Sequence, residues 1–112
     1  MSISTHILDT ATGTPAVDVP LSLARWQDAD WELLQATATD ADGRCKQLLP
    51  DNERFEPGMY RVRFDTATYY EAKDLAGLYP YVDVVFEVKP GQAHYHIPLL
   101  LTANGYTTYR GS

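Results

Sequence analysis

Two histidines in strand-like segments are the side chains of this sequence best suited to acid–base chemistry. His6 has the opposite parity to Ile7, and His96 has the opposite parity to Ile97. Because side chains alternate between the two faces of a strand, both histidines face away from the core if the isoleucines face it. Imidazoles exchange protons near neutral pH, so the pair could share acid and base roles if the two strands are neighbours. The alternative at each position is an ordinary exposed or hydrogen-bonded histidine.

Two arginines and a polar terminal segment could bind a substrate. Arg44 follows Asp42-Gly43 at a predicted turn, where it either binds a planar anion or a carbonyl, or is simply solvated. Residues 109–112 read Tyr-Arg-Gly-Ser and follow the strand-like run 105–108, so they need not be a loose tail. Arg110 has the same two interpretations as Arg44, and a third as a structural ion pair that anchors the terminus.

Other chemistries have weaker support. His94 and His96 point the same way on a strand, and with His6 they could bind zinc. No Cys, Asp or Glu cluster accompanies them, which counts against a metal site. The single cysteine, Cys45, could be a nucleophile, but lone cysteines are usually small buried hydrophobic residues. The sequence contains no Gly-x-Ser-x-Gly elbow, no phosphate-binding loop and no dinucleotide fingerprint.

Length and charge bound the class of protein. The 112 residues predict one domain, residues 1–112, with a single core. The formal net charge of −6 argues against binding to nucleic acid through phosphates. No apolar run approaches the roughly 20 residues of a membrane span, and residues 1–6 do not resemble a secretory signal. With only one cysteine, these features predict a cytoplasmic protein that binds neither nucleic acid nor membrane.

The dominant hydrophobic period is two, which predicts a β-sandwich. Alternation covers residues 3–8, 19–24, 59–65 and 81–88, and turn signals such as Asp42-Gly43 and Asn104-Gly105 separate the segments. Residues 92–101 are partly apolar on both faces, as expected if one face packs on the core and the other on a ligand or a second subunit. Residues 27–30 predict a hairpin connection and residues 51–56 a surface loop. Pro98 cannot donate a ladder hydrogen bond, so we expect a bulge or an open position there.

One segment has a helical pattern. Residues 66–76 place Tyr69, Tyr70, Ala72 and Leu75 at helical spacing. Thr68 and Glu71 have the spacing of a capping box. The pattern predicts one short helix that ends at Gly77.

Three blocks of residues resemble the transthyretin-like 5-hydroxyisourate hydrolases over essentially the whole chain. The first is Ser-Thr-His-Ile-Leu-Asp at 4–9, with Thr-Gly-Thr-Pro-Ala at 12–16 after it. The second spans 39–45 and ends in Asp-Gly-Arg-Cys. The third is His-Tyr-His-Ile-Pro-Leu-Leu-Leu at 94–101, followed by Tyr-Arg-Gly-Ser at 109–112. Each block is moderately specific, and their combination in this order is highly specific.

The resemblance implies an all-β fold, a transthyretin-like β-sandwich of two four-stranded sheets with one short helix, and a homotetramer with active sites in a channel between dimers. It implies hydrolysis of 5-hydroxyisourate to 2-oxo-4-hydroxy-4-carboxy-5-ureidoimidazoline by opening of a ring amide, without a cofactor or metal. By motif, the catalytic residues are His6, Arg44 and His96. These three residues, Tyr109 and Ser112 then form the substrate site, and His94 has no catalytic role.

Two non-enzymatic functions remain as alternatives. A hormone carrier of the transthyretin type would bind aromatic ligands in the same channel without hydrolysing them. An interaction or carbohydrate-binding module would use exposed aromatic residues such as Trp26 and Trp31. Neither alternative requires His6, Arg44 and His96 together, so these three residues favour the hydrolase.

Overall fold

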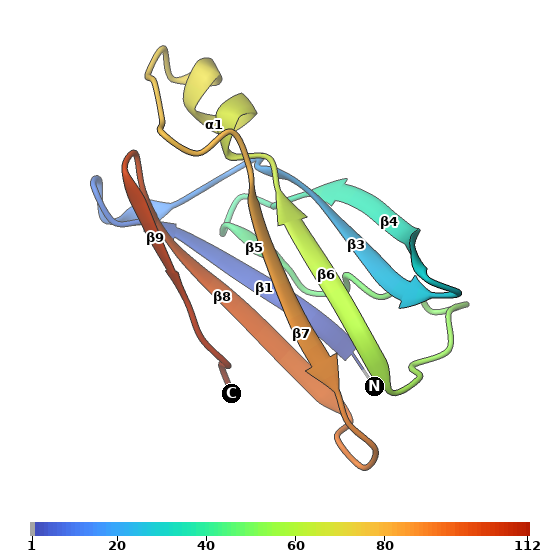
Figure 1. The fold of residues 1–112 in the computed structure, drawn as a ribbon. Helices are drawn as coiled ribbons and strands as arrows, with labels where there is room; N and C mark the ends of the chain where they lie inside the picture. Colours follow the sequence, from blue (N-terminus) through green and yellow to red (C-terminus); the bar gives the residue numbers. More distant parts are fainter. Residues whose placement is uncertain (1) are drawn as a thin grey trace.

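A computed structural model describes residues 2–112, which form two antiparallel-rich sheets packed face to face, with one helix at one end (Figure 1). No helix within this range is long and apolar enough to cross a membrane. In chain order the elements are β1 Ser2–Asp9, β2 Thr14–Pro15, β3 Pro20–Gln27, β4 Asp30–Ala38, β5 Arg44–Cys45, β6 Gly58–Phe64, α1 Thr66–Ala72, β7 Val82–Val88, β8 His94–Thr102 and β9 Gly105–Thr108.

The two sheets confirm the predicted sandwich. One has the strand order β4-β3-β6-β7, and the other has the order β2-β1-β8-β9. The short strand β5 also pairs with β1, at Thr5 and His6, whereas β2 pairs with β1 further along, at Leu8 and Asp9. Two short segments therefore share one edge of β1, and one of these sheets has five strands where four were expected.

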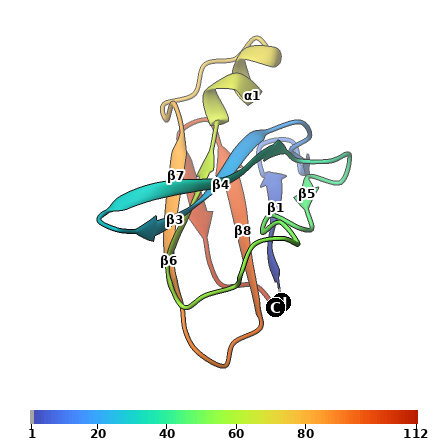
Figure 2. The ribbon, with the colours of Figure 1, turned by 90° about the vertical axis from the view of Figure 1, so that its right-hand side faces the viewer.

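Strands β1 and β8 pair in parallel, although 92 residues separate the partners. Their register aligns Ser4 with His96 and His6 with Pro98. The side view in Figure 2 shows β1 and β8 side by side, with the start of β1 and the C-terminus far from α1. The two histidines His6 and His96 therefore come from opposite ends of the sequence.

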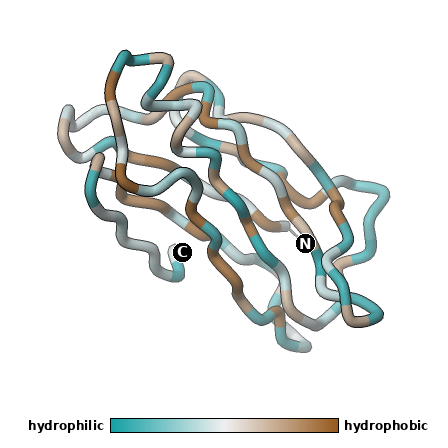
Figure 3. The backbone as a smooth tube through the Cα atoms, turned by 45° about the horizontal axis from the view of Figure 1, so that its top comes forward, coloured by the Kyte–Doolittle hydropathy of each residue, from teal (hydrophilic) through white to brown (hydrophobic). Residues whose placement is uncertain are grey.

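The core follows the predicted alternation. Ile3 and Ile7 of β1 and Leu99 and Leu101 of β8 are fully or almost fully buried between the sheets. Along the backbone, hydrophobic and hydrophilic residues alternate within the strands (Figure 3). Because β1 buries one parity, Ser4 and His6 lie on the outer face of the sheet. The predicted outward orientation of His6 and His96 is thereby confirmed.

The helix is shorter than the sequence pattern predicts, and its cap is different. The side chain of Asp65, rather than Thr68, caps the N-terminus by accepting a hydrogen bond from the Thr68 backbone N–H at 3.2 Å. The helix ends at Ala72 and not at Gly77. The backbone N–H groups of Lys73 and Asp74 bond to carbonyls three residues back, and Asp74 has φ of 59°, which stops the helical hydrogen bonding early.

The connections at residues 27–30 and at Pro98 match expectation. Asp28 and Ala29, with φ of 54° and 62°, form the two-residue hairpin turn between β3 and β4. Around Pro98 the pairing of β8 with residues 105–111 is interrupted, and there is no bulge. Leu99 pairs with Thr108, the next two rungs carry no bridge, and His96 then bridges Gly111 in the same register.

Candidate active site

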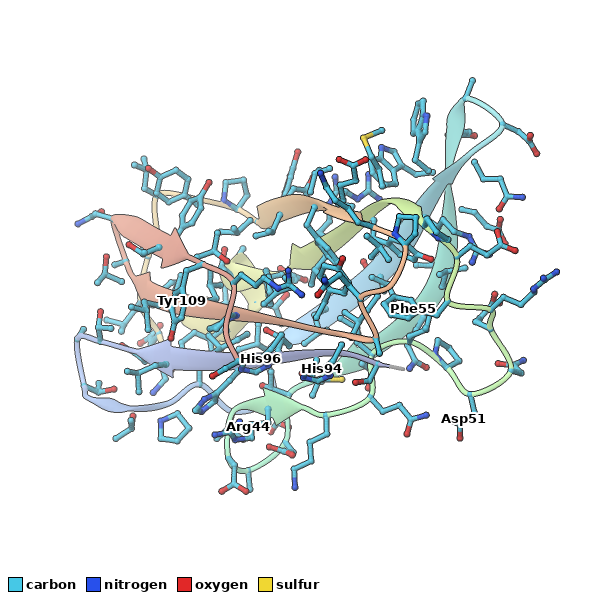
Figure 4. The ribbon with its side chains drawn as sticks, turned by 90° about the horizontal axis from the view of Figure 1, so that it is seen from below. Arg44, Asp51, Phe55, His94, His96 and Tyr109 are labelled. Atoms are coloured by element: carbon cyan, nitrogen blue, oxygen red, sulfur yellow. The ribbon has the colours of Figure 1, made fainter. Side chains whose placement is uncertain are left out.

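The predicted site residues meet on the outer face of the sheet formed by β5, β1 and β8. His6 lies opposite Arg44 of β5, and Ser4, two residues earlier on β1, lies opposite His96 of β8. His6 and His96 are therefore diagonal neighbours on adjacent strands, close enough for their side chains to approach each other. Seen from below, Arg44, His96 and His94 lie along the same side of the sheet (Figure 4).

A tight turn presents Arg44 at this face. The side chain of Asp40 accepts hydrogen bonds from the backbone N–H groups of Asp42 and Arg44, both at 2.9 Å. These bonds, the one from Arg44 first, lower the pKa of the Asp40 carboxyl. Gly43 has φ of 71°, and a Cβ there would lie 2.6 Å from the Ile7 carbonyl oxygen, so only glycine fits this turn.

The guanidinium of Arg44 has no carboxylate partner. Among residues 2–112, the ion pairs involve Arg25, Arg54, Arg63 and Lys89 but not Arg44. An arginine whose backbone is fixed by a turn and whose charge no carboxylate neutralises can bind a planar or developing anion.

His96 is held on both edges of its imidazole ring. Its Nδ1 lies 2.8 Å from the hydroxyl oxygen of Ser4. On the opposite edge, a Cβ added to Gly111 would lie 2.5 Å from Cδ2 of His96, so the glycine backbone packs directly against the ring. Nε2 and Cε1 remain as the ring atoms free to meet a substrate.

The pKa of His96 is lowered from its ordinary value of 6.5. Burial is the largest cause, and the positive charges of Arg44, His94 and His6 add to it. The imidazole is therefore neutral at pH 7 and able to accept a proton.

Residues 109–112 are ordered against β8. The backbone N–H of Gly111 donates to the carbonyl of His96 at 2.8 Å. The register extended from β9 places Tyr109 opposite Pro98 on the outer parity, with β8 between it and His6. Figure 4 shows Tyr109 on this segment, alongside β8. Ser112 is exposed and directly follows Gly111, beside His96. The predicted site residues Tyr109 and Ser112 therefore lie on the segment that pairs with His96, while His6 lies on the other side of β8.

Arg110 points away from this face. Of its three interpretations, the anchoring role matches the structure, although Arg110 makes no ion pair among residues 2–112. Its guanidinium lies 4.4 Å from the centre of the Tyr95 ring and donates to the Gln92 side chain and the His94 carbonyl. It borders a cavity of about 220 Å³ between the edges of the two sheets. Tyr109 and Gly111 lie on the outward-facing positions of the segment, so Arg110 between them faces inward. It anchors the segment through the Tyr95 ring and the uncharged oxygens of Gln92 and His94.

The other two chemistries considered from the sequence have no geometric support. Residues 2–112 contain no convergent group of three His, Cys, Asp or Glu side chains that could hold a metal ion. Cys45 lies opposite Thr5, on the inward parity of β1, and burial raises the pKa of its thiol. A raised pKa keeps the thiol protonated, which opposes a nucleophilic role.

Sequence reasoning did not identify Ser4 or Gly111. A usable signal was present, because Ser2 and Ser4 have the same spacing as His94 and His96. In a parallel pair this spacing gives two Ser–His contacts, and the structure contains both, Ser2 with His94 and Ser4 with His96. Detecting it requires knowing that the two segments are neighbours, which periodicity alone does not reveal.

Comparison with known proteins places these residues in a family. The model of the HIUase/Transthyretin family matches residues 3–111. A 5-hydroxyisourate hydrolase of Salmonella dublin is 46% identical over 98% of this chain and 80% of its own length. One from Mus musculus is 42% identical over 98% of this chain and 94% of its own.

Two solved structures have the same fold. A 5-hydroxyisourate hydrolase of Klebsiella pneumoniae covers all of both chains with a TM-score of 0.87 and 34% identity. Sea bream transthyretin in complex with thyroxine covers 99% of this chain and 95% of its own, with a TM-score of 0.91 and also 34% identity. The transthyretin-like sandwich is thereby established, and this chain belongs to the HIUase/Transthyretin family.

Proposed function

We infer that this protein hydrolyses 5-hydroxyisourate in urate degradation, yielding 2-oxo-4-hydroxy-4-carboxy-5-ureidoimidazoline. The observation that carries the inference is the placement of two imidazoles and an unpaired guanidinium on one face of one sheet. Relatives at 38–46% identity over nearly the whole chain, from bacteria and from mouse, are 5-hydroxyisourate hydrolases.

Opening a ring amide needs three things that this site can supply. A water oxygen must form a bond to the amide carbon, the carbon–nitrogen bond must break, and the leaving nitrogen must receive a proton. His6 and His96 hold the water, take its proton and return it to the nitrogen. General acid–base help of this kind contributes roughly a hundred- to ten-thousand-fold to the rate.

Arg44 has an electrostatic role in this mechanism. As the water attacks, negative charge develops on the carbonyl oxygen. The Asp40 turn fixes the backbone of Arg44, and from there its guanidinium stabilises that charge. Because no carboxylate lies within ion-pair distance of Arg44 in the described part of the chain, its full charge is available to the substrate.

The terminal segment completes the binding site. Tyr109 and Ser112 offer a phenol and a hydroxyl on the segment that pairs with His96, and they bind and orient the substrate. The site lies on an outer sheet face, so a second copy of the chain must cover it to exclude water. We propose a homotetramer in which paired faces form this channel. With one cysteine and no pairing partner for it, the protein suits the reducing cytoplasm.

The test is to generate 5-hydroxyisourate with urate oxidase and to follow its ultraviolet decay with and without the protein. Accelerated decay, in proportion to protein concentration, is the expected result. Decay at the uncatalysed rate would remove the proposed function. Size-exclusion chromatography with light scattering tests the tetramer separately, since a monomeric but active protein would contradict only the assembly.

A carrier function is the second candidate, because a thyroxine-bound transthyretin matches the fold as well as a hydrolase does. Fold similarity therefore does not choose between them. The combination of His6, Arg44 and His96 does, because a carrier of apolar ligands needs no imidazole pair. Tight thyroxine binding without hydrolysis would favour the carrier.

A further inference from the structure

We propose that Ser4 and Gly111 are positioning residues that hold His96 with its proton on Nδ1 and its Nε2 lone pair facing the substrate, so that His96 is the general base. The proposal rests on the proposed hydrolase function, and it adds the assignment of base and acid between the two histidines. His6 is then the group that donates a proton to the leaving nitrogen, and the proton that His96 took from water passes to His6 to complete the cycle.

The Ser4 edge of the ring provides the partner for Nδ1. The hydroxyl of Ser4, 2.8 Å from Nδ1, can either donate or accept a hydrogen bond. A neutral imidazole carries one proton, so Nε2 can accept a proton from water only when Nδ1 holds the ring proton. In the proposed state Nδ1–H donates to the Ser4 hydroxyl oxygen, and Nε2 carries the lone pair.

The Gly111 edge decides the rotamer. The glycine backbone packs against Cδ2, and a Cβ at residue 111 would lie 2.5 Å from Cδ2 and 3.1 Å from Cγ of Pro98. No side chain fits there unless the imidazole moves. The hydrogen bond from the Gly111 N–H to the His96 carbonyl keeps the glycine in this place. With Ser4 on one edge and Gly111 on the other, the ring cannot rotate away from the outer face.

The neighbouring pair provides a matched control within the same chain. Ser2 contacts Nδ1 of His94 through the same register, two residues earlier on both strands. His94 is exposed, whereas His96 is half-buried. Removing the Ser2 hydroxyl therefore repeats the chemical change of removing the Ser4 hydroxyl, but on a histidine outside the proposed machinery.

The first experiment combines ring-nitrogen NMR of ¹⁵N-histidine-labelled protein with steady-state kinetics. For the wild type we expect His96 to show a protonated Nδ1 and an unprotonated Nε2. Ser4→Ala should mix the tautomers and lower kcat by at least about tenfold, part of what a general base contributes, with a smaller change in KM. Ser4→Thr, which keeps the hydroxyl, should restore kcat. Ser2→Ala should leave kcat unchanged.

The second experiment tests the Gly111 edge with Gly111→Ala. We expect a shifted His96 ring signal and a loss of kcat at a thermal stability close to that of the wild type, because residue 111 lies outside the core. An unperturbed His96 ring in this variant would overturn the steric part of the proposal.

The tautomer measurement also separates this proposal from the proposed function. A wild-type His96 protonated on Nε2 would overturn the proposal even in an active hydrolase, and so would full kcat in Ser4→Ala. If the wild type has no hydrolase activity, the proposed function fails and the base assignment fails with it, while the NMR still decides whether Ser4 and Gly111 fix the ring.

Discussion

The two outer faces of the sandwich use their charged side chains differently. On the outer face of the β4-β3-β6-β7 sheet, Arg63 makes a bidentate pair with Asp83 at 2.7 and 2.8 Å, and the Arg61 guanidinium lies 4.8 Å from the centre of the Trp31 ring. On the β5-β1-β8 face, Arg44 has no carboxylate partner within the described residues, although the fold fixes its backbone.

This difference separates structural charge from available charge. A paired arginine interacts with a carboxylate of the same sheet, so its charge contributes to the stability of the fold and is not available to a ligand. An unpaired arginine beside two imidazoles adds little to stability, and its charge is directed at whatever covers the face. All three histidines of the chain lie on the β5-β1-β8 face as well. Alternating strands allow one sheet to carry a site without altering the core.

The strongest way to break this comparison is to replace the imidazoles. His6→Asn and His96→Asn should each lower kcat/KM by roughly a hundred- to ten-thousand-fold, because general acid–base catalysis is lost. The fold should remain, since both side chains lie outside the core. Ultraviolet assays and circular dichroism measure the two effects, and hydrolysis near the wild-type rate in either variant would contradict the assignment.

A matched arginine pair tests the comparison directly. Arg44→Gln should lower kcat/KM by roughly a hundred- to thousand-fold through the loss of oxyanion stabilisation, with little change in stability. Arg63→Gln should leave kcat/KM unchanged and cost about 1 kcal/mol of unfolding free energy or less, as for other partly exposed pairs. Kinetics and urea unfolding of both variants give the answer, and equal activity losses would refute the distinction.

Removing residues 109–112 tests whether the terminal segment belongs to the site. We expect a loss of at least about tenfold in kcat/KM, because the segment holds the His96 ring and supplies substrate contacts. The sandwich should keep its melting temperature within a few degrees, although some loss of tetramer is compatible with this view. A truncated protein that keeps its activity but loses its fold would reverse the expected roles.

Two glycines in the connections beside β1 test how much the close contact at Gly43 contributes to stability and activity. Both Gly13 and Gly43 have positive φ, of 73° and 71°, but only at Gly43 would a Cβ meet other atoms. Gly13→Ala should cost about 1–2 kcal/mol of unfolding free energy, from backbone strain alone. Gly43→Ala should cost about 3 kcal/mol and lower activity by displacing Arg44. Equal costs in chemical denaturation would show that the contact with the Ile7 carbonyl is unimportant.

The smallest expected effect is a shift in pH dependence. Burial and then the charges of Arg44, His94 and His6 lower the pKa of His96, and the neutral ring is the active form. On the acid side of the pH profile, the midpoint at which kcat/KM falls should therefore lie below pH 6.5, because activity is lost as pH falls through the lowered pKa of His96. His94→Gln removes one of the charges and should move this midpoint to higher pH without changing the maximum value of kcat/KM. A wild-type midpoint above pH 6.5 would contradict the lowered pKa of His96.

Sequence periodicity predicted which face each histidine occupies, because a strand side chain has only two choices and Ile7 and Ile97 fix them. It did not predict that β1 and β8 are parallel neighbours, because alternation carries no information about partners. The Ser4–His96 contact depends on that pairing and was missed for the same reason. Glycine at 43 marked a turn, and the Asp40 side chain that shapes it became visible only in three dimensions.

The helix end shows a second limit. The pattern of tyrosines and Leu75 continued past Ala72, but local hydrogen bonds and the left-handed Asp74 outweigh a weak propensity. The sequence also did not determine which way Arg110 points. Its orientation depends on the register in which the terminal segment pairs again with β8 beyond Pro98, at His96 and Gly111.

The pairing of the first long strand with the last, 92 residues apart, also has a consequence for synthesis on the ribosome. Loop closure over such a span is slow compared with local pairing, and β8 is made after most of the chain. The β3-β4 hairpin can form early, but His6 acquires its partner only when residues 94–111 have emerged. A nascent or truncated chain therefore carries no assembled catalytic pair, and the onset of hydrolysis would report the completion of folding.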